Sequence, residues 1–187
     1  MHFRIQIKNA TIVNEGRSYV GTLVIDDDRI DEVIEGQDAE PSIPVDETID
    51  GEGCYVLPGL IDDHVHFRDP GLTQKGDFCS ESRAAAAGGV TTVFDMPNCI
   101  PQTTTEQAFE EKWAIAASKS VVNYGLFFGA TAGNAYELAK LNPRKVAGVK
   151  LFMGSSTGNM LVDNERALKA IFESAKLPVM AHCERTD

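Results

Sequence analysis

Two histidines, one residue apart, have the spacing of a metal site. His64 and His66 end a short apolar run, Leu60–His66, that predicts a β-strand. Side chains two positions apart on a strand point to the same side, so both imidazoles can reach one metal ion. His182 ends another predicted strand, and in a βα barrel such strand ends form one rim. Three of the four histidines would then converge, whereas we expect His2 at the surface.

A lysine interrupts a second apolar run. Lys150 lies within Val146–Phe152, which otherwise predicts a buried strand. A buried lysine must pair with an anion or lose its proton. It could form an ion pair with a core carboxylate, form a Schiff base with a substrate, or react with CO₂ to give a carbamate that bridges two cations. The histidine pair favours the carbamate, because a Schiff-base enzyme has no need of such ligands.

Two further polar residues follow predicted strands. Arg68 comes directly after the histidine pair, in the sequence Arg68-Asp69-Pro70-Gly71. A guanidinium at that place can hold a substrate carboxylate through two parallel hydrogen bonds. Asn98 follows the next strand and offers an amide to a planar ring substrate. Either residue alone is also compatible with an ordinary salt bridge or a turn.

The elements that must position these residues fall into two regions. Residues 1–54 carry period-two apolar runs separated by Asn, Gly and Asp, which predicts antiparallel strands of a small β domain. Within this region Gln37–Glu47 is acidic and holds two prolines, which predicts a loop. Residues 55–187 alternate near-continuous apolar runs with amphipathic segments, as a parallel sheet with crossover helices does.

The second region predicts five strands and three clear helices. The strands are Leu60–His66, Val90–Met96, Val121–Phe128, Val146–Phe152 and Val179–His182. The helices are Phe78–Ala87, closed by two glycines, Glu106–Ser118, and Asn164–Ala175, with Asp163 expected as the N-cap of the last. In the second helix the apolar face is expected to hold Phe109, Trp113 and Ala117, and in the third Leu168, Ile171, Phe172 and Ala175. This pattern fits an open sheet or the first part of an eight-stranded barrel.

Composition narrows the class of partner. The chain has 187 residues, with 17 basic and 28 acidic side chains and a formal net charge of −11. That charge repels nucleic acid and anionic membranes, which leaves small molecules as the expected ligands. No stretch approaches the roughly 20 apolar residues of a membrane span, and no signal core follows Met1, so we expect a cytoplasmic protein. The four cysteines form no CxxC pair and are expected to be small buried residues.

The motifs together resemble one enzyme family. The sequence Gly59-Leu60-Ile61-Asp62-Asp63-His64-Val65-His66-Phe67-Arg68-Asp69-Pro70-Gly71, with Gly88-Gly89-Val90-Thr91-Thr92 and Asp95-Met96-Pro97-Asn98, resembles the N-terminal half of a dihydroorotase in the amidohydrolase superfamily. The arginine after the histidine pair points to dihydroorotase. The sequence Val149-Lys150-Leu151-Phe152-Met153-Gly154-Ser155-Ser156 also resembles hydantoinases and allantoinases.

The resemblance implies an α/β fold, with the first five strands of a partial TIM-like (β/α)8 amidohydrolase barrel preceded by a segment of a small β-sandwich domain. It implies two zinc ions per chain, bound by His64, His66 and His182 and bridged by Lys150 as its carbamate. Arg68 and Asn98 would hold the carboxylate of the substrate, dihydroorotate or N-carbamoyl-aspartate, in the reversible ring closure of pyrimidine synthesis. We expect the full-length protein to be a homodimer.

The family pattern extends beyond this chain. A further zinc histidine and the aspartate that acts as general base and acid are expected beyond residue 187, so these residues supply no catalytic acid or base. Barrels of this type need about 250 residues. We therefore expect a truncated barrel, inactive alone, that ends at Arg185-Thr186-Asp187. The alternatives are an allantoinase or hydantoinase, a Schiff-base barrel, and a non-catalytic dihydroorotase-like subunit that binds a transcarbamoylase.

Overall fold

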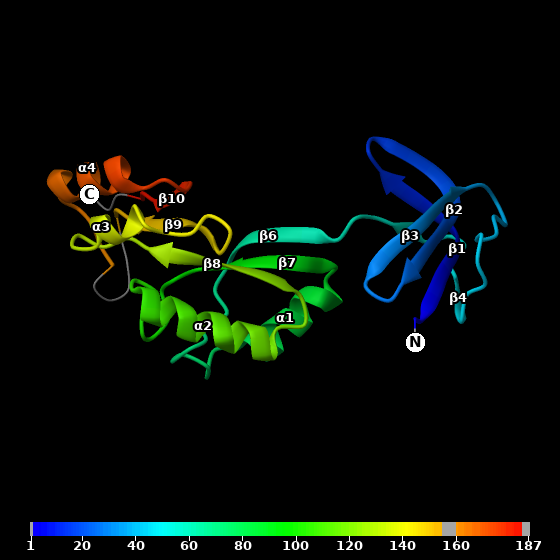
Figure 1. Ribbon diagram of the computed structural model, residues 1–187, viewed down its shortest axis with the longest axis horizontal. Helices are drawn as coiled ribbons and strands as arrows, with labels where there is room; N and C mark the ends of the chain where they lie inside the picture. Colours follow the sequence, from blue (N-terminus) through cyan, green and yellow to red (C-terminus); the bar gives the residue numbers. More distant parts are fainter. Residues whose placement is uncertain (1, 155–159, 185–187) are drawn as a thin grey trace. The chain divides into compact units, whose positions relative to one another are not determined.

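The computed structural model describes residues 2–154 and 160–184, in two compact units, Met1–Pro58 and Gly59–Asp187 (Figure 1). The sequence places the boundary after residue 54. In the structure Tyr55–Val56 (β5) still pairs with the first strand, and the first unit continues to Pro58. Ser155, Ser156 and residues 185–187, which the sequence motifs include, lie outside the described residues.

The first unit is one five-stranded sheet. β1 (Arg4–Asn14), β2 (Arg17–Asp26) and β3 (Arg29–Glu35) form the expected antiparallel arrangement, in the order β3-β2-β1. β4 (Glu47–Asp50) and β5 instead run parallel to β1. The antiparallel pairing predicted from the apolar runs is therefore confirmed for β1, β2 and β3, whereas the two short parallel strands were not predicted. The polar segment after β3 carries the chain past β2 to the other side of β1. This long connection allows the next strands to run parallel to β1, which a tight hairpin would not.

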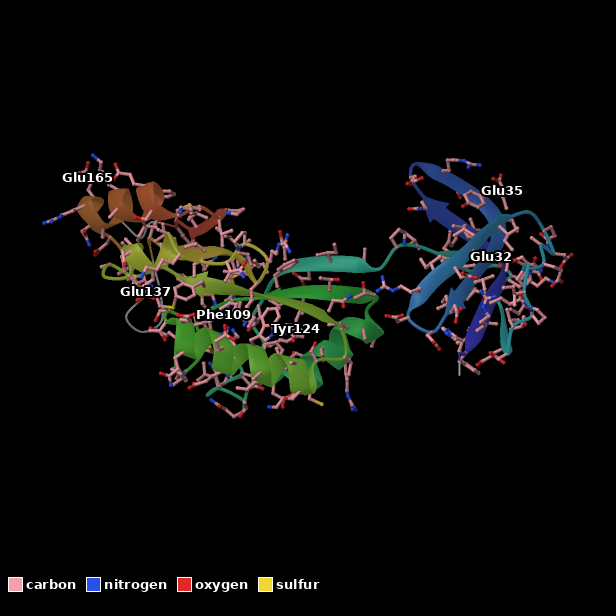
Figure 2. The ribbon with its side chains drawn as sticks, in the orientation of Figure 1. Glu32, Glu35, Phe109, Tyr124, Glu137 and Glu165 are labelled. Carbon is pink, nitrogen blue, oxygen red and sulfur yellow. The ribbon has the colours of Figure 1, made fainter. Side chains whose placement is uncertain are left out.

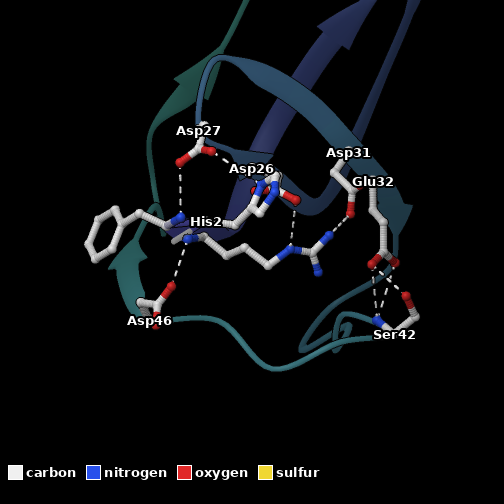
Figure 3. A network of polar contacts seen from close by, with 9 residues as sticks. His2, Asp26, Asp27, Asp31, Glu32, Ser42 and Asp46 are labelled. Carbon is white, nitrogen blue, oxygen red and sulfur yellow. Dashed lines mark hydrogen bonds and ion pairs between the residues drawn. The ribbon is translucent and has the colours of Figure 1, made fainter.

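A buried arginine joins the ends of these strands. Arg4 is only 8% exposed, and its guanidinium forms ion pairs with Asp26 and Asp31. Its backbone N–H donates to Asp46 Oδ2 at 2.8 Å (Figure 3). His2, 80% exposed at its side chain, lies 3.1 Å from Asp26 Oδ1, which confirms its predicted surface position. These contacts connect the N-terminal strand to the end of β2, to β3 and to the segment before β4.

The second unit is built on a curled parallel sheet in the order β10-β9-β8-β7-β6. The strands are β6 (Leu60–Val65), β7 (Val90–Asp95), β8 (Asn123–Gly129), β9 (Val146–Phe152) and β10 (Val179–His182). All four pairings are parallel. The predicted partial barrel is confirmed, and the predicted strand bounds differ from the observed ones by at most two residues.

In the part of the chain that the structure describes, four helices connect these strands. They are α1 (Phe78–Ala87), α2 (Glu106–Lys119), α3 (Ala135–Leu138), for which no bounds were predicted, and α4 (Glu165–Ser174). Asp77 caps α1, because its side chain accepts the Ser80 N–H at 2.8 Å. The cap of α4 is Asn164, which accepts the Ala167 N–H, so the prediction of Asp163 is wrong by one residue. No described helix has the length and apolar character needed to span a membrane.

The core of this unit packs the sheet against its helices; α1 and α2, green in Figure 1, contribute Phe78, Phe109 and Ala116, and α3 and α4 contribute Leu138 and Ile171. Phe109 and Tyr124 point into this layer (Figure 2), where Trp113 packs edge-on to Tyr124 at 5.1 Å between ring centroids. The buried face of α2 is rotated from the predicted one. Lys112 and Ala116 are buried and Ala117 is exposed.

Two other burial predictions are wrong in part. On α4, Ala167 and Ile171 are buried, whereas Phe172 is 53% exposed. Of the cysteines, only Cys99 is buried, while Cys54 and Cys183 are exposed and Cys79 is intermediate. All four are free thiols, in agreement with the absence of a CxxC pattern. Both errors come from exposure that depends on neighbouring elements rather than on local spacing.

Candidate metal and substrate site

The histidine pair lies at the carboxyl end of β6. His64 belongs to the strand and His66 follows it directly. Their ring centroids are 5.4 Å apart at an interplanar angle of 50°. His182 is the last residue of β10, at the same end of the parallel sheet but on the opposite edge strand. The structure therefore has the three predicted histidines at the ends of parallel strands, where barrel enzymes carry their active sites.

Lys150 lies inside β9 and is almost completely buried, at 1% exposed. Its Nζ atom lies 5.1 Å from the centroid of the Phe152 ring. Among the described residues, no carboxylate forms an ion pair with it. Burial lowers the pKa of Lys150, an effect that the nearby Cys183 opposes. A neutral amine is the form that reacts with CO₂, so a buried lysine without an acidic partner fits the donor set expected of a carbamate ligand.

His64 shares an electrostatic environment with the other candidate ligands. Burial lowers its pKa most, and the neighbouring Lys150 and His182 lower it further. A neutral imidazole is the form that binds metal. The ligand nitrogens of the three histidines do not all lie within 4.8 Å of one another. Among the described residues, only His2, Asp26 and Asp27 bring three candidate ligand atoms this close together. The donor types fit a metal, and the spacing is wider than in a closed site.

Asn98 contacts a histidine directly. Its Oδ1 lies 2.8 Å from Nδ1 of His66. If Nδ1 carries the proton, the amide oxygen accepts it and Nε2 is left to bind a metal. Burial lowers the pKa of His66, and the hydrogen bond to Asn98 opposes that shift. The sequence predicted only a substrate contact for Asn98, and this orienting contact was missed, because a strand-end position does not indicate which neighbour a side chain meets.

Arg68 and Asn98 line one cavity. This cavity has a volume of about 240 Å³ and is also lined by Lys75, Gln102 and Ile100. The backbone of Arg68 is left-handed, with φ at 67°. The positive charge of Arg68 contributes to lowering the pKa of His66, so the guanidinium acts electrostatically on a candidate metal ligand. Two of the residues that line the cavity, Arg68 and Lys75, are cationic, and a third, Asn98, contacts His66.

A family model described as Dihydro-orotase-like matches residues 53–184. The chain belongs to this family. It is 39% identical over 184 residues to a dihydroorotase of Methanosarcina acetivorans, which covers 98% of this chain and 38% of that protein. It is 40% identical over 187 residues to a dihydroorotase of Methanothermobacter thermautotrophicus, covering 99% of this chain and 40% of that protein. It is also 35% identical over 193 aligned positions to an allantoinase of Desulfitobacterium hafniense, covering 42% of that protein.

Solved structures of related enzymes share the fold. An L-hydantoinase (dihydropyrimidinase) from Arthrobacter aurescens superposes with a TM-score of 0.86 at 29% identity, over 98% of this chain and 41% of that one. A D-hydantoinase superposes with a TM-score of 0.74 at 33% identity, over 41% of its chain. The chain thus spans about two fifths of the length of the dihydroorotase-like relatives that it matches. The amidohydrolase fold is shown across both units of the chain.

Proposed function

We propose that this chain is the N-terminal part of a zinc-dependent dihydroorotase, which hydrolyses dihydroorotate to N-carbamoyl-aspartate and catalyses the reverse ring closure in pyrimidine synthesis. One observation carries the proposal most directly: a buried lysine without a described acidic partner lies in the strand next to His182 and acts electrostatically on His64. Dihydroorotases at about 40% identity along nearly the whole chain support the choice of substrate. We place the activity in the cytoplasm, in a homodimer of the complete protein.

His64, His66 and His182 would hold two zinc ions together with the carbamate of Lys150. When bound, zinc supplies a hydroxide nucleophile at neutral pH and polarises the amide carbonyl. Asn98 would keep the proton of His66 on Nδ1, so that Nε2 faces the metal. Arg68 would pair with the carboxylate of the ring and fix the scissile amide beside the metals. The general acid and base would come from residues outside this chain.

Allantoinase or hydantoinase activity is the second candidate, because an allantoinase at 35% identity and hydantoinase structures also match. Arg68 separates these functions. A ring without a carboxylate would leave the guanidinium unpaired in the site. Retention of all four candidate ligands argues against a non-catalytic subunit.

The test uses the complete protein with dihydroorotate, allantoin and hydantoin as substrates. We expect turnover of dihydroorotate, and loss of about 100-fold or more in kcat/KM on Arg68→Ala with zinc content unchanged. Lys150→Ala should remove bound zinc, measured by elemental analysis. Preferential turnover of allantoin or hydantoin, insensitive to Arg68→Ala, would transfer the proposal to the second candidate.

A further inference from the structure

Two lysines on α2 form ion pairs with two aspartates near the candidate site. Lys112 is fully buried; its Nζ lies 2.5 Å from Asp95 Oδ2 and donates to the carbonyl of Met96 at 2.7 Å. Lys119 Nζ lies 2.7 Å from Asp69 Oδ2. The two lysines are seven positions apart, two turns of helix, and so lie on the same side of α2. One helix face therefore reaches both the end of β7 and the loop after β6.

Both aspartates hold the backbone around Arg68. Asp95 Oδ1 accepts the N–H of Phe67 at 2.7 Å, one residue before the arginine. Asp69, one residue after it, is 3% exposed, and its Oδ2 contacts Lys119. Phe67 is also buried, at 5% exposed. Arg68 is thus a partly exposed residue between two buried and anchored neighbours.

The conformation of Arg68 requires such anchoring. A φ of 67° is left-handed, which is unfavourable for a residue with a Cβ atom. Backbone of this kind persists where the surrounding contacts over-determine it, and it is concentrated at ligand-binding sites. The carbonyl of Arg68 also accepts the N–H of Leu72 at 3.0 Å. The contacts on both sides specify one backbone path at the residue that lines the cavity with Asn98.

We propose that Lys112 and Lys119 are positioning residues for substrate binding: through Asp95 and Asp69 they fix the backbone of residues 67–69 and so the direction in which Arg68 meets the substrate carboxylate. The role rests on the proposed function, because it assumes that Arg68 binds a carboxylate. Neither lysine needs to touch substrate. The free energy of ordering Arg68 is then spent on folding rather than on binding, which is the advantage of a preorganised site.

The first experiment is Lys119→Ala in the complete protein, assayed with dihydroorotate. We expect KM to rise between about 10-fold and 100-fold, as for a misplaced binding group, with kcat and zinc content near the unmodified values. Lys119→Arg should restore KM, because it keeps the ion pair with Asp69. Lys145→Ala is the matched control, since Lys145 pairs with Glu110 of the same helix and has a similar side-chain exposure, 34% against 36%.

A double-variant cycle separates positioning from general loosening. In an Arg68→Ala background, Lys119→Ala should change KM less than about twofold, because the group that transmits the effect is gone. The proposal would be overturned if the effects of the two substitutions on KM multiply. It would also be overturned if Lys119→Ala loses zinc, or lowers kcat and leaves KM unchanged.

Lys112 needs a different design, because Lys112→Met alone would leave Asp95 as an unpaired buried carboxylate. Lys112→Met combined with Asp95→Asn removes both charges and keeps an oxygen to accept the Phe67 N–H. We expect this variant to fold, with a raised KM and with faster hydrogen exchange at the Phe67 amide. If hydrogen exchange at the Phe67 amide is unchanged both in this variant and in Lys119→Ala, the proposal that the two lysines position residues 67–69 is refuted. This holds even if the unmodified protein turns over dihydroorotate. Absence of turnover in the unmodified protein would instead count against the proposed function.

Discussion

At the scale of single residues, the side-chain amide of Asn98 offers two groups, an oxygen and a nitrogen, that suit different roles. Its amide oxygen contacts Nδ1 of His66 at 2.8 Å. Asn98 also lines the same cavity as Arg68. The amide nitrogen remains as a donor for an anionic substrate group. One amide can therefore orient a metal ligand and bind substrate at the same time. These two roles can be separated chemically, since only the first needs an acceptor and only the second needs a donor.

Asn98→Ala removes both roles, and Asn98→Asp keeps only the acceptor. We expect Asn98→Ala to weaken zinc binding about 10-fold to 100-fold, as loss of a group hydrogen-bonded to a metal ligand does. Asn98→Asp should retain zinc and lose substrate affinity, because its carboxylate repels the substrate carboxylate. Chelator competition measures zinc affinity, and steady-state KM measures substrate binding. Asn123→Ala, an exposed asparagine at the start of β8, is the control. Equal zinc affinities of Asn98→Ala and the unmodified protein would contradict the orienting role.

At the scale of elements, the loop after β6 and helix α1 are held by local backbone contacts. The N–H of Ile100 donates to the carbonyl of Pro70 at 3.0 Å, which packs the loop after β7 against the loop after β6. Gly71 stands at this contact with φ at 83°, and a Cβ atom there would overlap the carbonyl of Ile100. At the other end of the loop, Asp77 and Ser80 form a capping box that starts α1.

Gly71→Ala should therefore destabilise the protein. Both the left-handed backbone and the overlap with Ile100 oppose a side chain, so we expect a loss of about 1–3 kcal/mol in the free energy of unfolding. Gly133→Ala is the matched control, because a Cβ atom at Gly133 would meet no atom within 4 Å. Denaturant titration of both variants measures the difference. Equal denaturation midpoints for Gly71→Ala and Gly133→Ala would show that the loop accommodates the side chain without loss of stability.

Asp77 gives α1 a pH-dependent stability. The Ser80 N–H lowers the pKa of Asp77 below its usual 3.8, and Lys119 adds to the shift. Because the folded state holds the proton less tightly than the unfolded state, the stabilisation is present above the unfolded pKa and is lost as pH falls through the lower folded pKa. We expect Asp77→Ala to lower Tm at about pH 6, with the difference from the unmodified protein shrinking as the pH falls below 3.8. Asp163→Ala, which removes no cap, should show no such pH-dependent difference.

The extent to which sequence predicted the fold and site differs from residue to residue. Lys150 was identified because a charge inside an apolar run is visible locally, and the parallel strands because their apolar runs are continuous. Lys112 was missed, because a charge on an amphipathic helix ordinarily faces water and its burial depends on Asp95 from another element. For the same reason the Asn98 contact to His66, across 32 positions of sequence, could not be predicted from spacing.

At the scale of the whole molecule, the chain is shorter than the dihydroorotases that it resembles. The chain spans about two fifths of its dihydroorotase relatives. Several large apolar side chains of the described residues are exposed, among them Leu60 and Ile61 of β6, at 57% and 66%. Exposed apolar surface on an edge strand favours association.

We expect a protein of these 187 residues alone to lack dihydroorotase activity and to associate in solution. The reason is that the general acid and base would be absent while apolar surface remains uncovered. Light scattering and a ureide assay on the purified chain test both expectations, with the complete protein as the control. Turnover above the rate of buffer alone would contradict the first expectation, and a monodisperse monomer the second.

The position of two candidate ligands, one on each edge strand, has a consequence for unfolding. His64 and His182 are 182 − 64 = 118 positions apart in the chain, on β6 and β10, with three strands between them. A metal cluster held by both would bind the folded chain and not the unfolded one, so its binding free energy would add to the stability of the folded sheet. Such a cluster would link the first and last strands of the sheet reversibly, and removal of the metal by a chelator would break that link.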